Sequence, residues 1–172
     1  MEQEEHAAEA HPLQVLLIED SDTDAHVVET AMRKYMKSAK FARALTMKDG
    51  KNALQDGKAD VLLLDLNLPD TTGPEDTYGQ IKEWTNKLPV IIMTSMKDRL
   101  LARRMVYEGA ADFLNKDIVS ASPKIIHNAI EFSMERHAAA QKIMAEKESA
   151  EKESKEKDSI LSCFMGGYSI RK

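Results

Sequence analysis

The sequence has very little cysteine, since Cys163 is the only one among 172 residues. A single cysteine excludes internal disulfides and metal sites built from cysteine clusters, so we expect a reducing compartment, most simply the cytoplasm. Long apolar runs are also missing: none approaches the roughly 20 residues needed to cross a bilayer. The N-terminus lacks the positive start and apolar core of a signal peptide. These absences predict a chain without membrane insertion.

A basic surface is absent as well, because the formal net charge is -5. DNA-binding domains usually carry a basic patch or stripe, so we expect no DNA partner. The length allows one ordinary domain with a real core and some excess. We predict a disordered acidic tail (residues 1–12), a domain (13–137), a charged helical extension (138–159) and a short apolar C-terminal tail (160–172).

Short apolar runs recur along the domain and are too short for typical helices, which favours buried strands. Patterns with helical spacing lie between them. Strands are predicted at residues 13–18, 41–46, 61–64, 90–93 and 111–114, and helices at 21–36, 48–55, 74–87, 98–109 and from 122 onward. Strand and helix thus alternate five times, which predicts an α/β fold with a doubly wound, five-stranded parallel sheet and an extended last helix.

Polar side chains follow four of the predicted strands at the point where each strand ends. Glu19 and Asp20 follow the first strand, Asp65 the third, Thr94 the fourth and Lys116 the fifth. The carboxyl ends of parallel strands lie on one edge of a sheet, so we expect these groups to converge. Three converging carboxylates repel one another and need a cation. Mg²⁺ suits them, and the absence of His and Cys from these loops disfavours zinc.

A carboxylate whose cluster is neutralised by a metal can act as a nucleophile toward phosphorus. Asp65 is the best candidate because it ends the central strand. Phosphoryl transfer requires positioning and positive charge on the transferred oxygens. We expect Mg²⁺ to bind one oxygen, the Lys116 ammonium a second, and the Thr94 hydroxyl with a backbone N–H a third.

Four motifs in this order make the chain resemble the receiver domain of two-component response regulators, over about residues 13–137. They are Glu19-Asp20; Asp65 within Leu-Asp-Leu-Asn-Leu-Pro-Asp-Thr-Thr-Gly; Val-Ile-Ile-Met before Thr94-Ser95; and Glu-Gly-Ala-Ala-Asp-Phe-Leu-Asn before Lys116. The resemblance implies a (βα)5 flavodoxin-like fold. It also implies a phosphoacceptor signalling protein rather than an enzyme.

The resemblance further implies that a histidine kinase or phosphotransfer protein phosphorylates Asp65, and that an output protein, which the sequence does not identify, then binds. It implies Mg²⁺ held by Glu19, Asp20, Asp65 and the carbonyl of Asn67. Two other classes stay open. One is a scaffold that acts through the C-terminal helix and tail without phosphorylation. The other, which we disfavour, is an aspartate-nucleophile phosphatase, because Asn67 stands where such enzymes need a second Asp as general acid.

The resemblance also implies a switch, in which Thr94 or Ser95 moves toward the phosphoryl group and Phe113 turns inward. One departure stands out: relatives usually have proline after the lysine, often through a cis bond, and here Asp117 follows Lys116. A non-proline cis bond costs roughly 3 to 4 kcal/mol, so we predict a trans bond and a shifted loop.

No helix breaker interrupts the chain from the last predicted helix to Gly166, so we expect that helix to continue beyond residue 137. Pairs such as Glu153 and Lys157 stand in the favourable i,i+4 orientation. The heptad positions are too polar for a strong coiled coil, so we favour a solvated extension over a dimer seam. A homodimer through the last two helices of the domain stays open.

Overall fold

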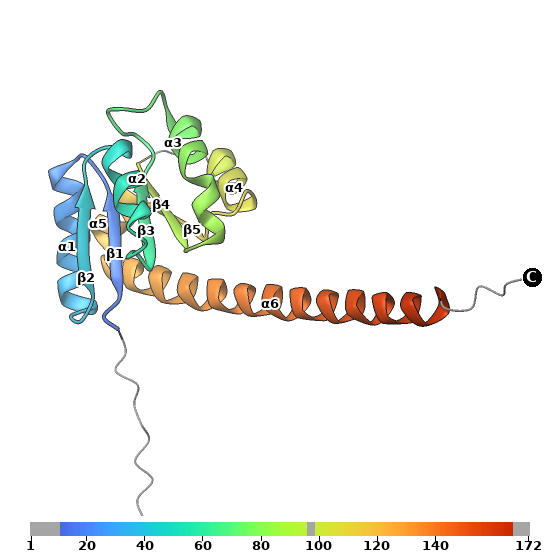
Figure 1. Ribbon diagram of the computed structural model, residues 1–172. Coiled ribbons are helices and arrows are strands. Elements are labelled where there is room, and N and C mark those ends of the chain that lie inside the picture. The colour runs from blue at the N-terminus through green and yellow to red at the C-terminus, as the bar shows by residue number, and fades with distance from the viewer. Residues whose placement is uncertain (1–10, 96–98, 167–172) are drawn as a thin grey trace, which may run out of the picture. The chain divides into compact units, whose positions relative to one another are not determined.

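A computed structural model describes residues 11–95 and 99–166 of the chain (Figure 1). The chain divides into two compact units, residues 1–135 and residues 136–172, and each is described by itself. The acidic tail expected at residues 1–12 lies almost entirely outside the described residues, and so do residues 167–172 of the expected apolar tail.

The first unit is built on a five-stranded parallel sheet with strand order β2-β1-β3-β4-β5 (Figure 1). The strands are β1 (Gln14–Ile18), β2 (Lys40–Ala44), β3 (Val61–Asp65), β4 (Val90–Thr94) and β5 (Asp112–Asn115). Every residue of β3 and β4 is buried. This matches their unbroken apolar runs, because a parallel strand covered by helices on both faces has no solvent side. The predicted fold class is confirmed.

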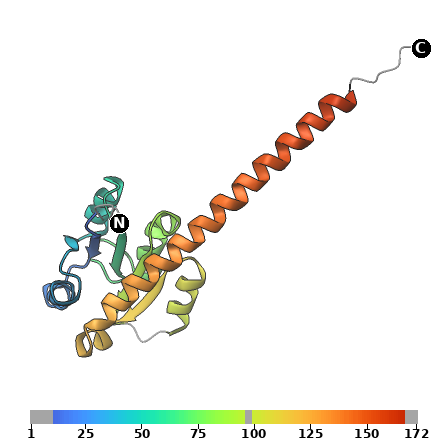
Figure 2. The same ribbon diagram turned by 90° about the horizontal axis from the view of Figure 1, so that it is seen from below.

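Helices connect successive strands and cover both faces of the sheet (Figures 1 and 2). They are α1 (Asp22–Tyr35), α2 (Met47–Gln55), α3 (Pro74–Ile81), the 3-10 helix η1 (Lys82–Asn86), α4 (Arg99–Tyr107), α5 (Lys116–Ala121) and α6 (Lys124–Gly166). One core packs the sheet against α1 and the start of α6, with Val28, Ile126 and Ile130 fully buried. The other packs it against α2, α3 and α4, with Leu54 and Ile81 at its centre.

The helix predicted over residues 74–87 forms only to Ile81, and its last turn tightens into η1. The hydroxyl of Thr85 donates to the carbonyl of Lys82 at 2.8 Å. This i−3 partner competes with the α-helical backbone bond, a competition typical of Ser and Thr side chains inside helices.

Helix α5 is absent from the sequence-based expectation, which placed loop between the fifth strand and residue 122. It forms because Asn115 caps it: the side-chain Oδ1 accepts from the backbone N–H of Asp117 at 2.8 Å and of Ile118 at 3.4 Å. Asn is among the best N-cap residues, since it satisfies amides that lack intrahelical partners. The described residues contain no cis peptide bond, so the predicted trans bond between Lys116 and Asp117 is confirmed.

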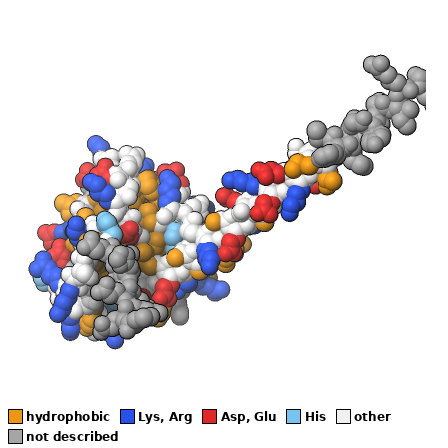
Figure 3. All heavy atoms as spheres, turned by 60° about the horizontal axis from the view of Figure 1, so that its bottom comes forward, with side chains coloured by type: hydrophobic (Ala, Val, Ile, Leu, Met, Phe, Trp, Pro, Cys, Tyr) orange, Lys and Arg blue, Asp and Glu red, His pale blue; other side chains and the backbone are white. Residues whose placement is uncertain are grey.

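The second unit contains the remainder of α6, whose side chains from residue 138 to 161 are exposed. The predicted continuation of the last helix is therefore confirmed. Figure 3 shows acidic and basic side chains interspersed along it. One predicted i,i+4 pair, Glu153 with Lys157, has its charged atoms 4.0 Å apart. Among the described residues, no helix combines the length and the apolar character needed to cross a membrane.

Candidate functional site

Three carboxylates gather at the carboxyl edge of the sheet. Glu19 and Asp20 follow β1, and Asp65 ends β3, the neighbouring strand, in which Leu64 pairs with Ile18. One oxygen of each carboxylate lies within 4.8 Å of the others. Glu19 and Asp65 are buried, at 0% and 3% exposure, whereas Asp20 is exposed. The structure therefore forms the acidic group expected from the sequence, with one side open to solvent.

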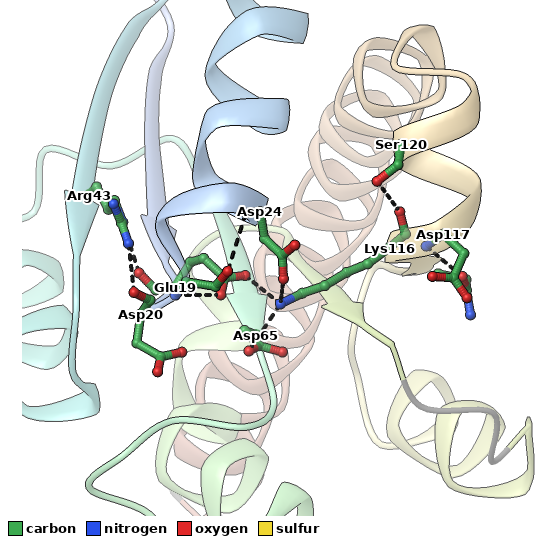
Figure 4. Close-up of polar contacts among 10 residues, drawn as sticks. Glu19, Asp20, Asp24, Arg43, Asp65, Lys116, Asp117 and Ser120 are labelled. Carbon is green, nitrogen blue, oxygen red and sulfur yellow. Dashed lines mark hydrogen bonds and ion pairs between the residues drawn. The ribbon is translucent and has the colours of Figure 1, made fainter.

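Lys116 reaches into this group from the start of α5 (Figure 4). Its Nζ lies 2.6 Å from Glu19 Oε2, 2.7 Å from Asp24 Oδ2 and 3.1 Å from Asp65 Oδ2. A lysine ammonium has three N–H donors, so each donor has a carboxylate to meet. The side chain is only 11% exposed, which strengthens these ion pairs relative to surface pairs.

Burial raises the pKa of Glu19 and of Asp65 above the usual carboxyl range, although Lys116 opposes the shift. Burial also favours the neutral amine of Lys116, but the carboxylates of Asp24, Glu19 and Asp65 outweigh that effect and raise its pKa. The three pKa shifts are consistent with one another. Several carboxylates share one ammonium, so the positive charge is fully offset while each negative charge is offset only in part. The site therefore retains excess negative charge.

One oxygen of Asp65, Oδ1, is buried and has no hydrogen-bond partner among the described residues. A buried unpartnered oxygen is costly unless something neutralises it. Together with the excess negative charge and the all-oxygen donor set, it fits a hard divalent cation such as Mg²⁺. The residues present are thus suitable for the metal that the sequence predicts.

The other predicted site residues lie at or near the same edge. Asn67 is exposed, two residues beyond Asp65. Thr94 ends β4 and is fully buried, one position past the residue that pairs with Asp65, and Ser95 after it is exposed. Phe113 lies on β5, half-buried, and packs against the core on the α4 side.

Sequence reasoning missed Asp24, which lies in the helix predicted at residues 21–36. Ser21 caps α1 by accepting from the amide of Asp24, and the Ser21 amide in turn donates to Glu19 Oε1 at 3.1 Å. The Asp24 carboxylate, not needed for that cap, is free to pair with Lys116. One signal could have indicated this contact: an acidic residue stands at the third position of the helix that follows the acidic loop.

Comparison with known proteins identifies the family. Residues 15–131 match the response regulator receiver domain family. The chain belongs to this family of two-component signalling proteins.

Among named relatives, the rice (Oryza sativa) two-component response regulator ORR3 is 32% identical over 110 residues, which cover 60% of this chain and 79% of the relative. The Arabidopsis thaliana two-component response regulator ARR5 is 31% identical over 138 residues, 72% of this chain and 73% of the relative. A solved response regulator receiver domain from Clostridium thermocellum has the same fold, with a TM-score of 0.61, 22% identity, and coverage of 74% of this chain and 98% of that chain.

Proposed function

We propose that this receiver accepts a phosphoryl group on Asp65 from the phosphohistidine of a histidine kinase or phosphotransfer protein. The observation that carries the proposal is the setting of the Asp65 carboxylate. Its Oδ2 lies 3.1 Å from the ammonium of Lys116, whereas its Oδ1 is buried without a partner among the described residues. Asp65 thus has one oxygen, Oδ1, left for the metal, and a second, Oδ2, beside the Lys116 ammonium, which is the proposed nucleophile.

In the transfer, an Asp65 oxygen forms a bond to phosphorus as the bond between phosphorus and the donor imidazole nitrogen breaks. The electron pair leaves with the nitrogen, which then takes up a proton. Lys116 provides positive charge for the transferred oxygens from a position already beside Asp65. The buried hydroxyl of Thr94, at the end of the adjacent strand, is proposed as a further donor.

The carboxylates of Glu19, Asp20 and Asp65 are proposed to hold Mg²⁺ together with the carbonyl of Asn67. When bound, Mg²⁺ supplies charge that offsets the negative phosphoryl oxygens. Because two of these carboxylates are buried and the third is exposed, the metal would keep one side toward water and the phosphodonor. Mg²⁺ commonly retains several waters, so an open side suits it.

The output is proposed to be a change in protein binding that starts from Thr94 or Ser95 and is passed to Phe113. Phe113 lines a groove of about 550 Å³ with residues of α4, among them Val106 and the 93% exposed Tyr107. Phe113 is half-buried and forms part of the groove wall, so a change in its side-chain orientation would change the shape of the groove. Phosphorylation would thus alter the surface that an output protein contacts.

Beryllofluoride with Mg²⁺, which mimics an acyl phosphate, tests the proposal. It should shift amide NMR signals around Asp65, Thr94 and Phe113, and acetyl phosphate should add one phosphoryl group by mass. Asp65→Asn should abolish both effects, while Asp60→Asn, just before the opposite end of β3, should retain them.

No response of the wild-type chain to either reagent would refute the proposal. Partner capture separates a second outcome. If a partner binds the wild-type chain and Asp65→Ala equally, with and without the phosphate mimic, a phosphorylation-independent scaffold is the better description.

A further inference from the structure

Arg43, next to the last residue of the edge strand β2, contacts the loop that carries Glu19 and Asp20 (Figure 4). Its Nε donates to the backbone carbonyl of Glu19 at 2.8 Å, and Nη2 donates to the backbone carbonyl of Asp20 at 2.9 Å. Nη1 donates to Asp22 Oδ1 at 2.7 Å. One side chain therefore bonds to the backbone of two of the three residues whose carboxylates line the proposed metal site.

The contacts follow from the sheet register. Arg43 pairs with Leu17 on β1, so its side chain starts beside the strand that leads into the acidic loop. The amide of Glu19 also donates to the carbonyl of Ala44 at 3.0 Å, which extends the pairing of β1 and β2 by one residue. The loop is thereby fixed on both its N–H and its C=O groups.

We propose that Arg43 is a positioning residue for the metal, acting through the backbone of Glu19 and Asp20 rather than by touching the ion. The inference rests on the proposed function for the identity of the metal. A guanidinium presents several donors in a rigid planar fork, whereas a lysine ammonium is a point charge on a flexible stem. Lysine at this position would keep the charge and lose the geometry. The Arg43 side chain is 19% exposed, so its contacts are partly shielded from competing water.

A positioning role and a purely electrostatic role predict opposite results. A positive charge near the carboxylates opposes cation binding, so its removal alone would tighten metal binding. Loss of the backbone contacts would let the carboxylates of Glu19 and Asp20 leave their common orientation, and this would weaken metal binding. The direction of the change in affinity therefore separates the two roles.

The experiment measures Mn²⁺ binding by electron paramagnetic resonance, with Mg²⁺ competition, in the full chain and in Arg43→Gln and Arg43→Lys. We expect about tenfold weaker binding in both variants, the scale typical of losing groups that orient metal ligands. Asp22→Asn is the matched control, because it alters the exposed contact and retains both carbonyl contacts; its affinity should change less than twofold.

Phosphorylation by acetyl phosphate provides the second measurement. In Arg43→Lys, the half-saturating Mg²⁺ concentration should rise about tenfold while the rate at saturating Mg²⁺ returns to the wild-type value. A reduced rate at every Mg²⁺ concentration, or unchanged or tighter Mn²⁺ binding in either variant, would overturn the inference. If Mn²⁺ binding depends on Arg43 but no phosphoryl transfer occurs, the inference stands and the proposed function fails.

Discussion

Replacing Asp65 by Asn should stabilise the metal-free chain at neutral pH, although Asp65 is the proposed phosphoacceptor. The carboxylate is 3% exposed, Oδ1 has no partner among the described residues, and Glu19 lies close by. Burial raises the pKa of Asp65 despite the ion pair with Lys116, which means that the fold disfavours the ionised form overall. An amide of the same shape removes that unfavourable charge.

The magnitude follows from the partial compensation by Lys116. A buried, unsatisfied group costs about 1 to 3 kcal/mol, and more when it is charged; the amide of Asn keeps the polar atoms and removes only the part of the cost that is due to the charge. The contact of 3.1 Å with Lys116 offsets part of that cost, so we expect a net gain in unfolding free energy of roughly 1 to 2 kcal/mol. For a domain of this size, such a gain raises Tm by roughly 3 to 8 °C.

The pH dependence of this gain has a definite sign. A raised pKa in the fold means that the folded state binds the Asp65 proton more tightly than the unfolded state, whose value is near 3.8. The stability that Asp65 contributes is therefore complete below pH 3.8 and is lost as pH rises through the folded-state pKa. The advantage of Asp65→Asn should appear above that pKa and disappear toward pH 3.8.

Thermal unfolding followed by circular dichroism, in EDTA and in excess Mg²⁺, measures the effect. At about 100 times its Kd, Mg²⁺ should add about 2.7 kcal/mol to the wild-type chain and less to Asp65→Asn, which lacks one ligand. Asp20→Asn is the matched control, because Asp20 is exposed: it should change Tm little in EDTA and reduce the Mg²⁺ effect. A lower Tm for Asp65→Asn in EDTA at pH 7 would refute the reasoning.

Three further substitutions test neighbouring contacts. Asp24→Asn removes one carboxylate that competes for Lys116, which should speed phosphorylation by acetyl phosphate about two- to fivefold, as expected for a partly exposed ion pair. Asp70→Ala removes a carboxylate that accepts from two amides in the first turn of α2, and should cost about 1 kcal/mol in thermal unfolding, typical of a lost helix cap. Asp117→Pro removes the amide that donates to Asn115 and disfavours helical backbone at the preceding lysine, so it should abolish the α5 amide pattern in NMR and cost about 1 kcal/mol.

The fold was predictable because the central strands are buried on both faces. Unbroken apolar runs such as 61–64 and 90–93 have few alternatives to a covered parallel strand. The edge strand was less certain: it was predicted at 41–46 and lies at Lys40–Ala44. Thr46 instead caps α2, by accepting from the amide of Asp49. A half-exposed strand has a weaker apolar pattern, which leaves its ends uncertain. The capping contact of Thr46, which that pattern does not indicate, separates β2 from α2.

The convergence of Glu19, Asp20, Asp65 and Lys116 was also predictable, since strand order along the chain and parallel topology place strand ends on one edge. The contacts of Asp24 and Arg43 were not. Neither residue belongs to a motif. Each contact joins two elements that lie far apart in sequence, and it depends on the length and direction of the side chain. Such contacts follow from three-dimensional placement, which composition and periodicity do not specify.

The departure at Asp117 explains how the lysine keeps its place without the proline found in relatives. Unlike proline, Asp117 has a backbone N–H, which donates to the side chain of Asn115; with this cap, α5 begins at Lys116. The backbone at Lys116 is therefore set by a helix N-terminus, while its Nζ is held by Glu19, Asp24 and Asp65. Because Asp24 is 34% exposed and the other two partners are buried, it is the partner that water can replace most easily, which would release the ammonium for a phosphoryl oxygen in the proposed transfer. The phosphoryl transfer proposed at Asp65 would thus depend on a local cap for the position of the lysine backbone and on charge for the position of its ammonium.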